Sequence, residues 1–195
     1  MTDSIIDLGP QTQVLARLAE RVTDEQLTDA TPCPDLRVRN MLGHLLGLTI
    51  AFRDAGRKSL GNTTDTNPFD TVPDIGPGWR EEFPKVLDEL AEAWRDPAAW
   101  TGMTRAGGFD LPGAVAGAVA IDELVIHGWD LARATGQPYA PDPTALQACH
   151  DFQLAAKDDP SRDEIFGPIV PVPQDASLLD RAVGLSGRDP EWTRS

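Results

Sequence analysis

Apolar residues recur every three or four positions along most of this sequence, and that spacing constrains the fold more than any other feature. It is the spacing of side chains on one face of an α-helix. The widest stripe predicts a helix from about 38 to 60 and consists of Val38, Met41, Leu42, Leu45, Leu48, Thr49 and Phe52. Further stripes predict helices at 10–22, 79–95, 112–136, 143–157 and 175–185. We therefore expect most of the chain to be helical.

Helices with one apolar face must bury those faces against one another, so we expect an all-α bundle. The 195 residues suffice for one sizeable core, and we predict a single domain spanning 1–195. Residues 96–111, which include Gly107 and Gly108, are expected to be a connector without a β-hairpin. Residues 61–78 are rich in Gly, Pro, Asn, Asp and Thr and predict a long surface loop. Such a loop in a compact domain often covers a functional site.

The net charge of −14 argues against binding to nucleic acid or to an anionic membrane surface, because phosphates would be repelled. No run approaches the ~20 apolar residues that a transmembrane helix needs. The N-terminal residues carry two acids and no basic region, unlike a secretory signal. Cys33 and Cys149 are too few for a disulfide framework. We expect a cytoplasmic protein with reduced cysteines.

Three polar side chains share one stripe of the helix predicted at 112–136. At 100° per residue, His127 lies about 40° around the helix from Glu123, and Asp130 lies about 20° to the other side. Small apolar residues one and two turns earlier occupy nearly the same stripe, which indicates that this face is buried. A carboxylate and an imidazole in a core need partners, since an unpaired buried charge is very costly.

His44 is the candidate partner on the helix at 38–60, because it shares the inward face of Met41 and Leu48. Two imidazoles and one carboxylate suit Zn²⁺ or another divalent transition ion and leave coordination positions for water or substrate. Asp130 would either orient an imidazole or act as a fourth ligand. Two alternatives stay open on spacing alone. The histidines could be hydrogen-bonded core residues, and Glu123 with His127 could be a simple i,i+4 ion pair.

Four other residues are functional candidates. Cys33 is expected to be a small buried residue in a proline-framed loop, and His150 lacks a partner at ligand spacing. Trp129 is expected to pack between helices. Arg133, three residues after Asp130, is the predicted salt-bridge partner of that carboxylate, with a substrate carboxylate as the alternative.

The segments TPCPDLRVRNMLGHLLGL and GFDLPGAVAGAVAIDELVIHGWDLARATG resemble a known family. They are similar to the DinB/YfiT-like bundles, and more narrowly to an actinobacterial group related to the metal-binding domain of mycothiol-dependent maleylpyruvate isomerase. The C-terminal FGPIVPVPQDASLLDRAVGLSGRDPEW also looks typical of one branch of that group. The resemblance implies a DinB/YfiT-like four-helix bundle with additional short helices and an irregular C-terminal tail. It also implies the metal ligands His44, Glu123 and His127.

The resemblance further implies a divalent-metal-dependent enzyme, with zinc as the expected metal and mycothiol as a co-substrate. A metal-bound thiolate would attack a small electrophilic substrate, giving transferase or isomerase chemistry. The isomerase itself carries an additional C-terminal domain beyond the length of this chain. A metal-dependent hydrolase, in which a metal-bound water attacks, and a non-catalytic metal-binding protein both stay open. A homodimer also stays open.

Overall fold

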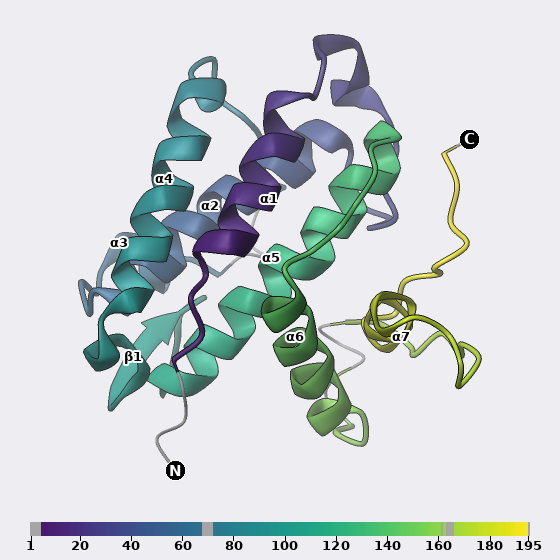
Figure 1. The fold of residues 1–195 in the computed structure, drawn as a ribbon. Helices are drawn as coiled ribbons and strands as arrows, with labels where there is room; N and C mark the ends of the chain where they lie inside the picture. The colour runs from purple at the N-terminus through teal and green to yellow at the C-terminus, as the bar shows by residue number, and fades with distance from the viewer. Residues whose placement is uncertain (1–4, 68–71, 161, 163–165, 195) are drawn as a thin grey trace.

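The core of the structure is a bundle of four helices (Figure 1). The computed structural model describes residues 5–67, 72–160, 162 and 166–194. The bundle helices are α1 (Gly9–Glu20), α2 (Val38–Gly56), α4 (Trp79–Arg95) and α5 (Gly113–Thr135). Helices α1 and α2 each pack against both α4 and α5. This arrangement confirms the predicted all-α class and the four-helix bundle.

Shorter elements surround the bundle. Helix α6 (Pro143–Ala156) packs against α5, and α7 (Leu178–Leu185) packs against α6, so the C-terminal part of the chain extends the structure beyond α5 (Figure 1). The remaining elements are η1 (Asp24–Thr28), α3 (Asn62–Asp65), η2 (Pro97–Trp100), β1 (Met103–Ala106) and β2 (Phe109–Pro112). The predicted helices therefore all exist, although α2 ends four residues earlier than expected and α7 begins three residues later.

The hairpin formed by β1 and β2 corrects the expectation of a plain connector at 96–111. The strands are antiparallel, with Ala106 opposite Phe109. Gly107 and Gly108 form the two-residue turn with φ of 60° and 83°. A hairpin turn with both central residues at positive φ favours Gly-Gly, so the turn signal was present in the sequence. The first strand lacks the alternation of apolar and polar residues that normally accompanies such a turn, and each strand is only four residues long.

The loop at 61–78 lies partly on α2. Residues 68–71 are outside the described residues, and residues 62–65 form α3. Arg39 donates two hydrogen bonds of 2.8 and 2.7 Å to the Asp74 carboxylate, and Asn40 donates one of 2.9 Å to the Pro73 carbonyl. A Cβ on Gly43 would lie 2.7 Å from the Asp74 backbone. The end of this loop is thus fastened to the turns of α2 that surround Gly43.

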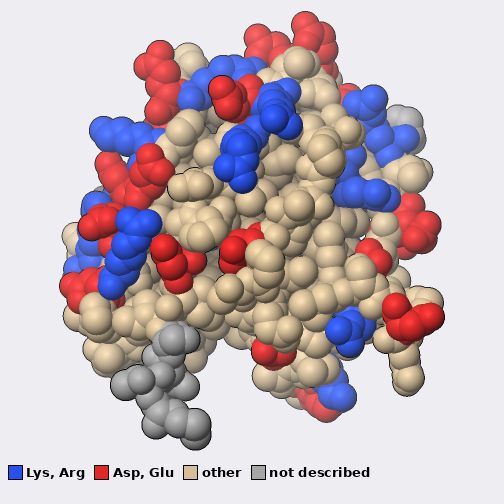
Figure 2. All heavy atoms as spheres, viewed as in Figure 1, with Lys and Arg blue, Asp and Glu red and all other residues tan. Residues whose placement is uncertain are grey.

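Charged side chains of both signs lie on the surface in small groups. Figure 2 shows acidic and basic side chains interspersed over the face that it presents. Acidic residues are in excess in the chain as a whole, with 31 Asp and Glu against 17 Lys and Arg. Among the described residues, none of the helices has the length and apolar character needed to cross a membrane.

Glycine allows α5 to approach the connector that follows α4. Trp94 is buried and donates a 2.9 Å hydrogen bond to the Phe52 carbonyl, and Trp100 donates one of 2.8 Å to the Trp94 carbonyl. The two indole rings meet edge to face at 5.0 Å. Because the Trp100 ring is held in this way, it cannot easily move aside, and a Cβ on Gly117 would lie 2.5 Å from it.

We predict opposite effects of alanine at two helical glycines. Gly117→Ala should lower the free energy of unfolding, because the clash with Trp100 outweighs the better helix propensity of alanine. Gly47→Ala should raise it by up to about 1 kcal/mol, since Gly47 is inside α2 with nothing within 4 Å of an added Cβ. Urea unfolding of both variants measures the difference. Equal effects would mean that the close packing of α5 on Trp100 is absent.

Candidate metal centre

Three side chains from two helices converge at the interface between α2 and α5. His44 comes from α2, and Glu123 and His127 come from successive turns of α5. One donor atom of each residue lies within 4.8 Å of the other two, and no other group of at least three such residues lies close enough to hold a metal ion within the described ranges. The structure therefore brings together the three residues that the helical spacing singled out.

The Oε2 oxygen of Glu123 is the centre of this cluster. It lies 2.9 Å from His127 Nε2 and 3.6 Å from His44 Nε2. The imidazole rings are perpendicular, with centroids 4.8 Å apart. Oε2 is buried, and its contacts with the described residues do not have the geometry of a hydrogen bond, although His127 Nε2 lies at ion-pair distance. A buried carboxylate oxygen without a well-aligned hydrogen bond is costly, and a cation among these three donors would satisfy it.

Asp130 approaches His127 from the other side of the ring. Its Oδ2 lies 2.8 Å from His127 Nδ1, and the side chain is fully buried. An ionised carboxylate only accepts hydrogen bonds, so we assign the Nδ1 proton to this contact. In the neutral ring the lone pair is then on Nε2, the nitrogen that faces Glu123. Histidine ligands of metals are typically held in this way.

The structure corrects the predicted partner of Asp130. Arg188 donates to Asp130 Oδ2 at 3.1 Å and to Oδ1 at 3.4 Å. Arg133 instead donates to the backbone carbonyls of Trp192 and Pro190, and its guanidinium lies 5.7 Å from the Trp129 ring centroid. The i,i+3 spacing suggested a local pair, but the C-terminal segment lies close enough to bind Arg133 and to place Arg188 beside the carboxylate.

The charges of the cluster shift one another's pKa values. Burial alone would raise the pKa of the Glu123 carboxyl, but the contacts with His127 and His44 hold it well below its usual range. Burial opposes the charged form of His127, yet Asp130 and Glu123 together raise its pKa to about 9. Arg188 and His127 lower the pKa of Asp130 against the effect of burial. A divalent metal would have to displace the His127 proton on binding.

The raised pKa of His127 predicts how the stability of the metal-free protein depends on pH. A histidine whose pKa is raised on folding contributes stability that is fully present below its ordinary pKa of 6.5 and is lost as the pH rises through about 9. We expect the free energy of unfolding to fall over this interval by no more than ~3 kcal/mol. Urea unfolding with a chelator present, at a series of pH values, measures the slope.

The control for this slope is a second buried histidine. His127→Gln should remove the slope between pH 6.5 and 9, whereas His150→Gln should keep it, because His150 is on α6 and outside the cluster. A slope that survives His127→Gln would show that other groups produce it.

The remaining candidates lie outside the cluster. Cys33 is partly buried, and burial raises the pKa of its thiol to about 11. His150 is buried, with Nδ1 3.4 Å from a carboxylate oxygen of Asp151. Trp129 is buried, as expected for packing between helices.

A buried carboxyl next to the site was missed from the sequence. Asp122 accepts hydrogen bonds from the Cys149 thiol at 3.1 Å and from the Gln153 amide at 2.8 and 2.9 Å. Burial raises its pKa to about 7. These contacts join α5 to α6, and the polar and small residues on α6 give no local signal of an acidic partner.

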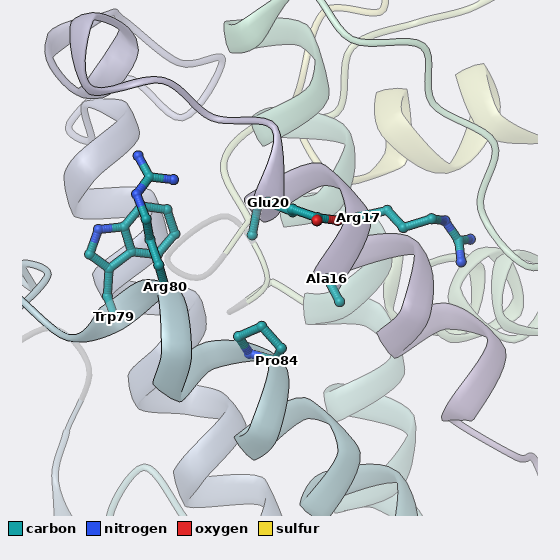
Figure 3. A pocket seen from close by; sticks show the side chains of 7 residues that line it. Ala16, Arg17, Glu20, Trp79, Arg80 and Pro84 are labelled. Carbon is teal, nitrogen blue, oxygen red and sulfur yellow. The ribbon is translucent and has the colours of Figure 1, made fainter.

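The cluster is open to solvent on one side. The side chains of His44 and Glu123 are 18 % and 24 % exposed, whereas that of His127 is 11 % exposed. Gly47, one turn after His44, is exposed and faces open space. A separate hollow of about 380 Å³ lies between α1 and α4, lined by Trp79, Arg80 and Pro84 among others (Figure 3). None of the three converging residues lines it.

Comparison with known proteins gives a family and two solved structures. The family model of the mycothiol maleylpyruvate isomerase N-terminal domain matches residues 8–132, a range that includes His44, Glu123, His127 and Asp130 but not Arg188. A crystal structure of the mycothiol-dependent maleylpyruvate isomerase is 16 % identical, with a TM-score of 0.47 over 72 % of this chain and 63 % of that chain. A histidine-to-alanine mutant of that isomerase is 15 % identical, with a TM-score of 0.46 and the same coverage. The chain thus spans less than two thirds of their length. No curated protein matches it.

Proposed function

The chain belongs to the family of the mycothiol maleylpyruvate isomerase N-terminal domain, and on that premise we propose that it is a divalent-metal-dependent enzyme that uses a low-molecular-weight thiol. Mycothiol is the proposed thiol, because the description of the family names it. The proposed reaction is the transfer of the thiol to a small electrophilic substrate, or an isomerisation when the thiol leaves again. The observation that supports a metal is the buried Oε2 of Glu123, which lies between two imidazole nitrogens without a well-aligned hydrogen bond.

The donor set fits a zinc ion. His44, Glu123 and His127 would hold it, since two imidazoles and one carboxylate are a typical ligand set of catalytic zinc. Zinc with three protein ligands keeps a position open, and the partial exposure of His44 and Glu123 supports access from solvent on that side. Bound there, zinc would keep a coordinating thiol in its thiolate form.

Two of the chain's own residues set the orientation of a ligand and the charge of this site. Asp130 accepts a hydrogen bond from the His127 Nδ1–H and thereby directs Nε2 toward the donor cluster. Glu123 supplies a negative charge that would balance part of the positive charge of a divalent ion. We also propose that residues 1–195 act as one domain, because α6 packs on α5, α7 packs on α6, and the segment after α7 reaches Asp130.

We predict that single ligand substitutions weaken metal binding and leave the bundle folded. His44→Ala, His127→Ala and Glu123→Gln should each lower zinc affinity by roughly 100-fold, or on the order of 3 kcal/mol, since four-ligand zinc sites bind with ~10–16 kcal/mol. The helices bury their own apolar faces, so far-UV circular dichroism should stay helical. Competition with a chelator of known affinity measures the change.

The matched control for these substitutions is His150→Ala, which removes a buried histidine from α6. It should leave zinc affinity unchanged. Zinc affinity that is equally unchanged in the His44→Ala and His127→Ala proteins would mean that these two histidines are structural.

Binding of the thiol to the metal is tested with cobalt in place of zinc. We predict that adding mycothiol, or a simple thiol analogue, to the Co²⁺-loaded protein produces a sulfur-to-cobalt charge-transfer band, because borderline-soft divalent ions accept thiolate readily. Binding should release a proton and strengthen as the pH approaches the free thiol pKa of ~8.5. The S-methylated form of the same thiol is the control and should give no band.

The outcome separates the proposed chemistry from its rivals. If the protein binds cobalt but no thiol changes the spectrum at any pH at which the protein is folded, the thiol-dependent reaction is wrong. Hydrolysis by a metal-bound water or a non-catalytic role would then take its place. Thiol-dependent turnover of a small electrophile distinguishes catalysis from thiol binding alone.

A further inference from the structure

The segment after α7 brings an arginine to the back of the candidate metal centre. Arg188 contacts both carboxylate oxygens of Asp130, and the same Oδ2 that accepts from Arg188 at 3.1 Å lies 2.8 Å from His127 Nδ1. The arginine side chain is 11 % exposed and that of Asp130 is fully buried. A continuous chain of contacts therefore runs from Arg188 through Asp130 and His127 to Glu123.

The backbone on both sides of Arg188 is held in place. Arg188 N–H donates to the Val183 carbonyl at 3.1 Å, and its Nη1 donates to the Ser186 carbonyl at 2.9 Å. Gly187 has a φ of 80°, a left-handed conformation that favours glycine. After Arg188, the chain is fastened to α5 by the hydrogen bonds of Arg133 to Pro190 and Trp192. The guanidinium thus reaches Asp130 from a segment anchored at both ends.

The geometry of the contact between Arg188 and Asp130 does more than balance the charge of the carboxylate. Any cation would compensate the buried carboxylate, but a guanidinium is a planar fork that fixes the plane of the group it binds. Fixing the plane of Asp130 keeps Oδ2 opposite Nδ1 and so limits rotation of the His127 ring. Rotation of that ring would turn Nε2 away from Glu123 Oε2, which lies 2.9 Å from it.

We infer that Arg188 is a positioning residue of the metal centre, which acts through Asp130 to hold the His127 imidazole in the orientation that a metal ligand needs. This inference rests on the metal site of the proposed function. It assigns a role to the C-terminal segment, which lies outside the residues 8–132 that match the family model.

The test compares substitutions at Arg188 with one in the same tail. Arg188→Met removes the charge and the fork, whereas Arg188→Lys keeps only the charge. The matched control is Arg194→Met, since Arg194 is an exposed tail arginine paired at 3.3 Å with Asp29, a residue outside the cluster. Cobalt and zinc affinities, the cobalt absorption spectrum and the midpoint of thermal unfolding are measured on each protein.

We expect Arg188→Met to lower metal affinity by about 10–100-fold, the usual effect of losing a group that orients a ligand, and to alter the cobalt spectrum. Arg188→Lys should recover thermal stability but not most of the affinity. Arg194→Met should match the wild type. Combining Arg188→Met with Asp130→Asn should cost no more affinity than Asp130→Asn alone, because both substitutions break the same chain of contacts.

Two results would overturn the inference. In one, Arg188→Met loses stability but binds metal like the wild type; in the other, Arg188→Lys restores affinity fully, so that charge alone suffices. If Arg188→Met does not fold, Arg188→Lys decides the matter. A wild-type protein that binds cobalt but no thiol would end the proposed reaction and leave this inference standing, whereas a wild-type protein that binds no metal would end both.

Discussion

Two carboxylates on one face of α5 set the constraint on which the site depends. Asp130 is fully buried and Glu123 is partly buried with its Oε2 oxygen enclosed, and an unpaired charge at either place would be costly. His127 lies between them and contacts both, at 2.9 and 2.8 Å. One imidazole cannot balance two carboxylates, so each needs a further partner from a distant part of the chain. Arg188 meets this need for Asp130, whereas the contact of His44 with Glu123 leaves the requirement of Oε2 only partly met.

Because of this asymmetry, the site has a closed side at Asp130 and a partly exposed side at Glu123. The Asp130 side is closed and fully hydrogen-bonded, which gives His127 a fixed orientation. The Glu123 side is partly exposed and keeps a buried oxygen without a well-aligned hydrogen bond. The apolar faces of α1, α2, α4 and α5 stabilise the bundle independently of the cluster, so the protein can carry an unsatisfied group where a ligand would bind. A buried polar atom of this kind calls for an explanation, and an ion bound at the site would supply one.

How much the sequence predicted depends on how local each signal is. The convergence of His44, Glu123 and His127 followed from helical periodicity, because each residue lies on an apolar face that must turn inward. The hairpin at 103–112 was missed, since its strands are too short to alternate and only the Gly-Gly turn marks it. The partner of Asp130 was wrong for a related reason. Spacing favours Arg133, three residues away, whereas Arg188 is 58 residues away and no periodic pattern links it to α5.

The position of Asp130 favours one of the two roles that its spacing left open. A fourth ligand would have to face the same point as Glu123 Oε2 and the two imidazole Nε2 atoms. Asp130 instead contacts Nδ1, on the opposite side of the His127 ring from Nε2, and both of its oxygens are engaged by Arg188. This geometry favours the role of orienting His127 over that of a fourth ligand. In the proposed metal site, three protein donors would leave a coordination position for water or substrate. The partial exposure of His44 and Glu123, and the open space beside Gly47, would give access to that position from the solvent side of α2 and α5.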